Sequence, residues 1–171
     1  MAGIKGIPVI GQMPKLGIKI KYFDKSMPKL TVTEKGDWVD LRIAEAEVNG
    51  EPVLYDENGE LSYKAGDVVK FNLGVAMQLP NNAEAHVLPR SSTFKHYGLI
   101  LVNSVGMIDN CYCGDDDQWI GMFYALKDGK VAKYDRLLQF RIMLKMPPVL
   151  FQEVEKLGNP NRGGIGSTGV K

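Results

Sequence analysis

Short segments of alternating apolar and polar residues constrain the fold of this chain more than any other feature of its sequence. Residues 16–23 place Leu16, Ile18, Ile20 and Tyr22 on one side and lysines on the other, which is the period of two typical of a half-buried strand. Turn signals separate such segments at intervals of roughly ten residues, a spacing that indicates an all-β sandwich or barrel. Further strands are predicted over residues 37–46, 68–75, 83–90, 99–106, 118–126 and 131–146.

Asn-Gly and Asp-Gly pairs predict where the chain reverses direction. An Asn-Gly pair accepts positive φ at both central positions of a two-residue loop, which makes it a hairpin signal. The pairs at 49–50 and 58–59 predict one or two added hairpins within residues 48–63, and the Asp-Gly pair at 128–129 predicts another hairpin.

Little of the chain is predicted to be helical. Residues 91–98 are compatible with one helical turn, which Ser91 or Ser92 would cap. Residues 149–158 are the only longer helix candidate. Within the strand expected over 37–46, Trp38 is predicted to anchor the core.

Length and composition suit one globular domain. The chain has 171 residues, of which 44% are hydrophobic and 24% charged, and it can bury a core without disulfides. The net charge of +1 argues against nucleic acid as a partner, so any anion site must be local. We expect a β domain over residues 1–158 and a flexible glycine-rich arm over 159–171 that closes over a site.

Cysteine spacing and the lack of targeting signals bear on location. Cys111 and Cys113 are too close in sequence for an unstrained bridge, which fits a reducing compartment. Neither a leader pattern nor an apolar run of spanning length is present in this sequence. The expected location is the cytoplasm, with no membrane partner.

Two segments have the composition of a polyphosphate site. Residues 89–92, Pro-Arg-Ser-Ser, combine a cation and hydroxyls, although a polar turn with a helix cap explains them equally well. The tail from Arg162 adds a second cation, hydroxyls and glycines. Such a tail is commonly disordered, but glycines that admit backbone amides and a guanidinium are also the ingredients of a phosphate clamp.

A third segment carries a carboxylate, Asp109, three residues before an aromatic, Tyr112. On a straight strand these side chains would face opposite ways, so a turn or bulge is needed for both to meet one ligand. The acidic run at 115–117 is predicted to be a solvated loop. The two histidines, His86 and His96, and the cysteines do not form a recognisable zinc or thiol-protease pattern.

Taken in order, five short motifs resemble those of the trimeric deoxyuridine triphosphatases (dUTPases). Each motif alone is weak, but their order on an all-β background is specific. They cover most of the chain from Gly36 to Gly169. The motifs are Trp38-Val39-Asp40-Leu41, Pro89-Arg90-Ser91-Ser92 with Gly98, residues 106–114, Arg136-Leu137-Leu138-Gln139, and the glycine-rich tail from Arg162.

The resemblance implies a distorted jelly-roll fold with one short helix and a homotrimer with active sites between subunits. It also implies hydrolysis of dUTP to dUMP and pyrophosphate with Mg²⁺, by in-line attack of a water on the α-phosphate. Asp109 would activate that water, and Tyr112 would pack against the deoxyribose and leave no room for a 2′-hydroxyl. Asp40 would act on the metal only through water, and Arg162 would reach the γ-phosphate.

The resemblance assigns the remaining substrate contacts by motif. A hairpin backbone from Asn103 to Asn110 would hydrogen-bond uracil, as a pairing base does. The other residues expected to bind substrate are Arg90, Ser91, Ser92, Arg136 and Gln139 around the phosphates, Asn103, Gly106, Met107 and Ile108 around the base, and Ile165, Gly166, Ser167 and Thr168 in the arm.

The sequence departs from the family pattern in three places, of which the length of residues 48–63 points to a phage or Gram-positive-type member, located in the host cytoplasm if it is phage-encoded. Ile165 stands where an aromatic commonly stacks on uracil, and Cys111 replaces an acid that often follows Asp109. Residues 48–63 are longer than a compact member needs, and some phage members bind regulatory proteins. Two alternatives therefore remain, a dCTP deaminase-like enzyme, which would need a glutamate near the pyrimidine, and a nucleotide-gated regulatory protein.

Overall fold

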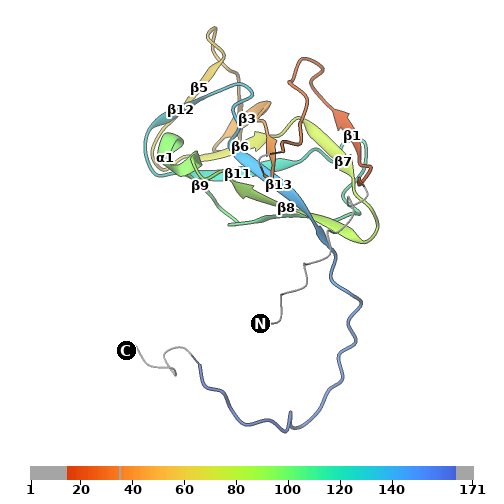
Figure 1. The fold of residues 1–171 in the computed structure, drawn as a ribbon. Helices are drawn as coiled ribbons and strands as arrows, with labels where there is room; N and C mark the ends of the chain where they lie inside the picture. Colours follow the sequence, from red (N-terminus) through yellow and green to blue (C-terminus); the bar gives the residue numbers. More distant parts are fainter. Residues whose placement is uncertain (1–14, 35, 165–171) are drawn as a thin grey trace, which may run out of the picture.

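The computed structural model describes residues 15–34 and 36–164, which form an almost purely β protein (Figure 1). The single helix of these described residues is α1 (Thr93–Tyr97). The strands are β1 (Lys19–Tyr22), β2 (Val39–Leu41), β3 (Glu45–Val48), β4 (Glu51–Val53), β5 (Glu60–Tyr63), β6 (Val68–Asn72), β7 (Val75–Gln78), β8 (Ala83–Pro89), β9 (Leu99–Leu101), β10 (Gly106–Ile108), β11 (Ile120–Ala125), β12 (Gly129–Ala132) and β13 (Leu138–Leu144).

Two antiparallel sheets make up most of the fold. One has the order β10-β8-β13-β2 and the other the order β4-β3-β6-β11-β9, with two-stranded ribbons β1-β7 and β12-β5 beside them. The sheets do not close into a barrel within the described residues. The predicted all-β, jelly-roll-like class is therefore confirmed, as an open arrangement of sheets.

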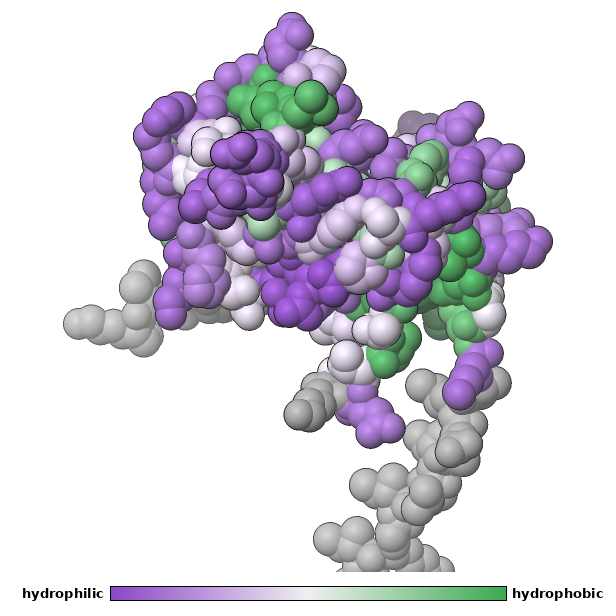
Figure 2. Space-filling model, turned by 90° about the horizontal axis from the view of Figure 1, so that it is seen from above, coloured by the Kyte–Doolittle hydropathy of each residue, from purple (hydrophilic) through white to green (hydrophobic). Residues whose placement is uncertain are grey.

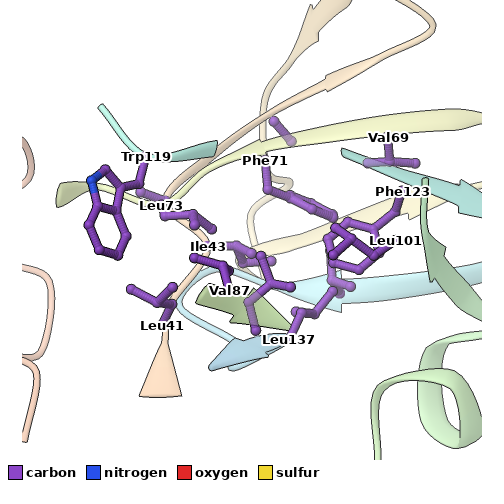
Figure 3. Close-up of a cluster of buried hydrophobic side chains, with 14 of the residues drawn as sticks. Leu41, Ile43, Val69, Phe71, Leu73, Val87, Leu101, Trp119, Phe123 and Leu137 are labelled. Carbon is purple, nitrogen blue, oxygen red and sulfur yellow. The ribbon is translucent and has the colours of Figure 1, made fainter. Parts of the chain in front are cut away.

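The core lies where the inward faces of these sheets meet, and alternation along the strands produces it. In β11 every second residue is buried, and Phe123 packs edge to face on Phe71 of β6 at 5.8 Å between ring centroids (Figure 3). Trp119 is fully buried and packs on Phe140 at 5.2 Å. The core anchor was predicted wrongly, because Trp38 is only half-buried and lies under the guanidinium of Arg141.

Only one of the three predicted hairpin turns joins two paired strands. Asn49 and Gly50 have φ of 54° and 90° and connect β3 to β4, which pair with each other. The turns at 58–59 and 128–129 were wrongly predicted as hairpins, because β5 and β12 pair with each other rather than with their sequence neighbours. Local turn chemistry reverses the chain but does not choose the partner strand.

Of the two helix predictions, one is confirmed and the other is wrong. Residues 93–97 form the expected helical turn, with Gly98 in the left-handed conformation at φ 66°. Ser92 stands at the N-cap position but makes no side-chain capping hydrogen bond, so the predicted cap is wrong. The helix predicted over 149–158 is wrong, because these residues have neither helix nor strand and are exposed. Their apolar side chains lack a surface to pack on within the described chain, and a short helix is marginal without such packing.

After β13 the chain leaves the sheets. Residues 145–164 run away from the β domain as an exposed segment without regular structure (Figure 1). The division of the chain at residue 158 stays a prediction. None of the described helices is long and apolar enough to cross a membrane, and the face seen in Figure 2 is mostly hydrophilic with separate hydrophobic patches.

Candidate active site

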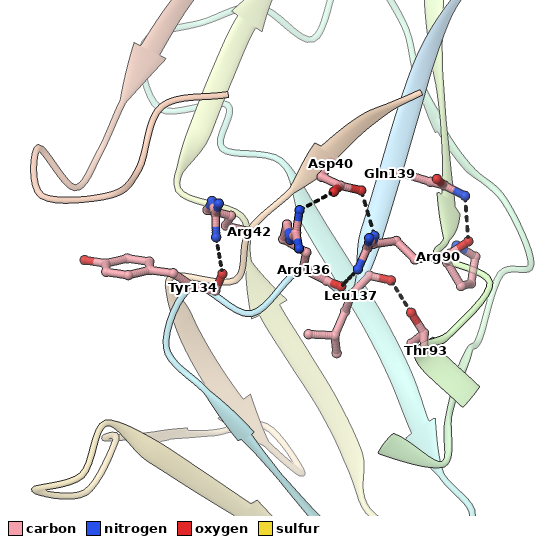
Figure 4. A network of polar contacts seen from close by, with 9 residues as sticks. Asp40, Arg42, Arg90, Thr93, Tyr134, Arg136, Leu137 and Gln139 are labelled. Atoms are coloured by element: carbon pink, nitrogen blue, oxygen red, sulfur yellow. Dashed lines mark hydrogen bonds and ion pairs between the residues drawn. The ribbon is translucent and has the colours of Figure 1, made fainter. Parts of the chain in front are cut away.

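The centre of the candidate site is a carboxylate that bridges two guanidinium groups (Figure 4). Arg90 Nε lies 2.7 Å from Asp40 Oδ1, and Arg136 Nη1 lies 3.0 Å from Asp40 Oδ2. Arg90 Nη1 also donates to the backbone oxygen of Arg136 at 3.3 Å. Residues from the first, second and fourth sequence motifs therefore converge, although 96 positions separate Asp40 from Arg136.

Strand register explains this convergence. Asp40 of β2 lies directly opposite Gln139 of β13, and Gln139 lies opposite Leu88 of β8. Directly opposed residues share a sheet face, so Asp40 and Gln139 lie side by side. Gln139 Nε2 donates to the backbone oxygen of Pro89 at 3.3 Å, which ties the end of β8 to this row.

Thr93 holds the Arg90 turn in place, and sequence reasoning did not identify it. Its side chain is fully buried, and Oγ1 donates to the backbone oxygen of Leu137 at 2.6 Å. The backbone N–H of Arg90 donates to the same oxygen at 3.0 Å. A threonine directly after the Pro-Arg-Ser-Ser turn gave no periodic signal, because its partner is 44 positions away. In the same turn Ser91 is exposed and Ser92 is half-buried.

The electrostatics of this cluster suit an anion. Two cations share one carboxylate, which leaves a local charge of about +1. The side chains of Arg90 and Arg136 are 29% and 48% exposed, so an anion can approach both guanidinium groups from solvent. Guanidinium groups also present paired donors that match phosphate oxygens.

The segment around Asp109 lies apart from this cluster. Asp109 is exposed and directly follows β10, the edge strand of the four-stranded sheet. The backbone N–H of Tyr112 donates to the oxygen of Asp109 at 3.1 Å, which forms the turn that the two side chains require. The ring of Tyr112 is 39% exposed, and its hydroxyl donates to the oxygen of Gln118 at 3.1 Å.

The prediction of a hairpin from Asn103 to Asn110 is wrong. β9 pairs with β11 in one sheet and β10 pairs with β8 in the other, so residues 102–105 carry the chain between sheets. Asn103 and Ser104 lie in this connection, where Ser104 has φ of 58°. Gly106, Met107 and Ile108 form β10 itself, and an edge strand leaves unpaired backbone donors and acceptors along its outer side.

Sheet geometry separates Asp109 from Asp40 within one chain. Asp40 lies in the same cross-strand row as Leu88, whereas Ile108 lies opposite Ala85. Relative to Asp40, Asp109 thus lies three strand spacings across the sheet, or about 14 Å, and four residues along the strand direction, or about 13 Å. The two acids are therefore about 20 Å apart, too far for both to contact one α-phosphate and its attacking water.

The remaining predicted residues lie in or beyond the exposed C-terminal segment. Arg162 is exposed, and the structure does not bring it together with Arg90, Asp40 or Asp109. Ile165, Gly166, Ser167 and Thr168 lie outside the described residues. Cys111 and Cys113 are free and exposed, as their spacing predicts.

The described acids and histidines do not converge into an all-protein metal cage. Both oxygens of Asp40 are already paired with guanidinium groups. This carboxylate therefore fits an outer role, in which it contacts a metal-bound water, better than direct coordination.

Comparison with known proteins identifies the family, although a search of protein-family models matches none to this chain. The chain is 49% identical over 154 residues to the SPbeta prophage-derived deoxyuridine 5′-triphosphate nucleotidohydrolase YosS of Bacillus subtilis, covering 90% of this chain and 99% of that protein. It is 32% identical over 154 residues to the deoxyuridine 5′-triphosphate nucleotidohydrolase of Rickettsia felis, covering 89% and 94%.

Solved structures support the same fold. The dUTPase of Staphylococcus bacteriophage 80alpha with dUpNHpp superimposes with a TM-score of 0.68 at 16% identity, covering 90% of this chain and 99% of that chain. The dUTPase of phage phi11 of S. aureus, whose structure shows the coordination of a structural Mg(II) ion, gives 0.64 at 13% identity, covering 82% and 98%. The chain therefore belongs to the dUTPase family, as its motifs indicated, and a prophage-derived member is among its relatives.

Proposed function

We propose that this protein hydrolyses dUTP to dUMP and pyrophosphate at a site shared between copies of the chain. The observation that supports this most directly is the Asp40-bridged pair of guanidinium groups, placed by three of the family's motifs at one corner of the sheet. Relatives over nearly the whole chain are named for this reaction.

In the proposed reaction, Asp109 accepts a proton from a water molecule as the water oxygen attacks the α-phosphorus in line. The bond from the α-phosphorus to the oxygen that bridges to the β-phosphorus breaks, and pyrophosphate leaves. The products are dUMP, which keeps the oxygen of the attacking water, and pyrophosphate, and the proton taken up by Asp109 is released to solvent. Positioning and charge neutralisation dominate such a transfer, so an exposed carboxylate suffices as the base.

The arginine cluster would hold the phosphates. Arg90 and Arg136 can each turn a guanidinium edge toward phosphate oxygens while Asp40 keeps both in place. Ser91, Ser92 and Gln139 would add hydroxyl and amide donors around the same anion. Arg162, reaching in on the C-terminal segment, would add a third guanidinium at the γ-phosphate.

Mg²⁺ bound to the triphosphate would neutralise developing charge. In this protein Asp40 would contact the ion's water shell, since both of its oxygens already bind arginines. The other described residues leave coordination to the phosphates and water.

Nucleoside recognition would take place at the edge strand and the turn that follows it. Backbone groups of Gly106, Met107 and Ile108 would pair with uracil along the free edge of β10. The half-exposed ring of Tyr112 would lie against the deoxyribose and exclude a 2′-hydroxyl. Ile165 would cover the base with an aliphatic side chain.

A second copy is needed because Asp109 follows the edge strand β10 whereas Asp40 lies on the opposite edge strand β2. Arg90 follows β8, the neighbour of β10, but the antiparallel register places it about six residues, or about 20 Å, from Asp109 along the strand direction. Contact between these different surfaces of successive copies is heterologous, and such contacts form a ring where the rotation between copies closes. A homotrimer satisfies this requirement. The outer face of β11 also exposes Ile120, Met122 and Tyr124, an unusually apolar surface for a solvated antiparallel sheet.

The two alternative functions, a deaminase and a regulatory protein, have less support than dUTP hydrolysis. A deaminase would need a glutamate beside the pyrimidine, and the turn after β10 offers Asp109 instead. A regulatory protein partner that binds near residues 51–61 stays a prediction.

A single assay of dUTP, UTP, dTTP and dCTP tests this proposal. With Mg²⁺ present, we expect dUTP to release pyrophosphate at a kcat/KM at least about 100-fold above the other three, since steric exclusion of one group yields roughly this discrimination. Removal of divalent ions with EDTA should stop turnover. Equal turnover of UTP would contradict the role of Tyr112, and release of ammonia from dCTP would favour the deaminase.

A further inference from the structure

The turn between β12 and β13 contains a tyrosine in a backbone conformation that tyrosine rarely adopts. Tyr134 has φ of 70°, in the left-handed region where a Cβ is unfavourable. Asn49, which shares this feature, is a residue type that tolerates it, whereas a bulky aromatic does so only when its surroundings impose it. Tyr134 lies two positions before Arg136.

Contacts from Arg42 and Ile43, the residues that follow β2, support this conformation. The N–H of Tyr134 donates to the oxygen of Ile43 at 2.8 Å. Its own oxygen accepts a hydrogen bond from Arg42 Nη1 at 3.0 Å (Figure 4). The N–H of Ile43 donates to Asp135 at 3.1 Å, so the turn is bonded on both sides to the continuation of the strand that carries Asp40.

The side chain of Tyr134 is held by the loop after β1. Its hydroxyl donates to Asp24 Oδ2 and lies 2.8 Å from Ser26 Oγ. Lys133 Nζ lies 3.0 Å from the same carboxylate oxygen and 4.9 Å from the centre of the tyrosine ring. Asp24 is therefore the common acceptor of a cluster that joins the N-terminal part of the chain to this turn.

The Asp24 carboxylate keeps its charge through the neutral pH range. Hydrogen bonds from Ser26, Tyr134 and Lys133, in that order of importance, hold its pKa well below the usual range. Ser26 donates both its backbone N–H, at 2.9 Å, and its hydroxyl, at 2.6 Å, to the other oxygen. The acceptor of the tyrosine hydroxyl is thus fixed in charge and in orientation.

We propose that Tyr134, held by Asp24, is a positioning residue that aims Arg136 at the phosphates of the substrate. The left-handed turn sets the direction in which the chain enters β13, and with it the side from which the Arg136 guanidinium reaches Asp40 at 3.0 Å. The same turn places the Arg136 backbone oxygen where Arg90 binds it. This inference rests on the proposed function, because it takes Arg136 to bind phosphate.

The expected consequence concerns binding rather than chemistry. If the turn populates other conformations, Arg136 is in place for only part of the time, and the apparent affinity for phosphates falls by that fraction. Phosphate contacts formed equally in the ground state and the transition state change KM and leave kcat nearly unchanged.

Two substitutions at residue 134 separate positioning from mere turn formation. Tyr134→Phe removes the hydroxyl that binds Asp24 and keeps the ring. Tyr134→Gly removes the ring but suits φ of 70° without strain, so it preserves the turn conformation, and thermal unfolding of the variant reports the stability lost with the ring. We expect both variants to raise KM for dUTP, and Kd for pyrophosphate measured by calorimetry, by about three- to tenfold, with kcat changed less than about twofold. Asp24→Asn should act in the same direction.

A double-variant cycle with Arg136→Gln shows whether the effect passes through Arg136. Adding Tyr134→Phe to Arg136→Gln should produce no further loss of pyrophosphate affinity. The control is Asp67→Asn, which removes a similarly exposed carboxylate that accepts bonds from Lys64 and Asn49 in a different turn. It should leave KM and Kd unchanged.

Wild-type pyrophosphate affinity in Tyr134→Phe and Tyr134→Gly would overturn the inference, as would full additivity with Arg136→Gln. A different result would contradict the proposed function. A wild-type protein that hydrolyses no dUTP, yet loses pyrophosphate affinity on Tyr134→Phe, would contradict the reaction and retain the positioning role.

Discussion

Replacing Asp109 with asparagine is expected to lower kcat for dUTP by about 10²- to 10⁴-fold, the usual contribution of a positioned general base. Asparagine keeps the size and shape of the side chain but cannot accept the proton of the attacking water. Because Asp109 is exposed and touches no phosphate in the proposed reaction, dUTP binding should persist. Steady-state release of pyrophosphate and calorimetric titration with a non-hydrolysable dUTP analogue measure the two quantities separately.

Asp116→Asn is the matched control for this experiment. Asp116 lies in the same loop, its side chain is 99% exposed, and its only ion pair is a long one to Lys21 within the part of the chain the structure describes. Its replacement should leave kcat within about twofold of the wild-type value, as is usual for exposed surface changes. An Asp109→Asn variant with full activity would remove Asp109 from the role of base.

Replacing Arg162 with alanine is expected to lower kcat by about 10³-fold, the lower end of what an added arginine contributes to phosphoryl transfer. The residue stands on the exposed segment after β13 and has no structural role in the β domain. Its effect must therefore come from contact with substrate when the segment closes over the site. Thermal unfolding should be unchanged, which distinguishes this loss from a folding defect.

Lysine at the same position tests the geometry of the contact. Arg162→Lys keeps the charge but loses the paired donors that match phosphate oxygens, so it should recover only part of the lost rate. Lys156→Ala, which removes another exposed cation from the same segment, is the control and should have little effect. If Arg162→Ala were as active as the wild type, the segment would not serve as a lid.

Much of the fold could be predicted because alternation is a local property. β1, β6, β8, β11 and β13 lie within or overlap segments whose apolar residues alternate, and burial follows that pattern in β6, β8 and β11, although not in β1, whose residues are mostly exposed. Strand partners could not be predicted, because β5 pairs with β12 across 66 positions from Tyr63 to Gly129. Trp38 and Trp119 look alike in sequence, and only the packing of sheets makes one the core anchor.

The residues of the candidate site, like the fold, could be predicted from the sequence only in part. Asp40, Arg90, Arg136 and Gln139 could be named because each lies in a short motif that resembles a family pattern. Residues that position them could not, because their roles arise from contacts between distant segments. Thr93 acts through Leu137, and Tyr134 acts through Asp24, 110 positions away.

Mixed oligomers test most directly the claim that the active site is shared between copies. Asp109→Asn and Arg90→Ala variants are prepared separately, each nearly inactive, then unfolded together and refolded as a 1:1 mixture. If each site takes Asp109 from one copy and Arg90 from another, random assembly leaves about a quarter of the sites intact, and about a quarter of wild-type activity should return. A mixture as inactive as its separate components would show that both residues act within one chain, and would contradict the account.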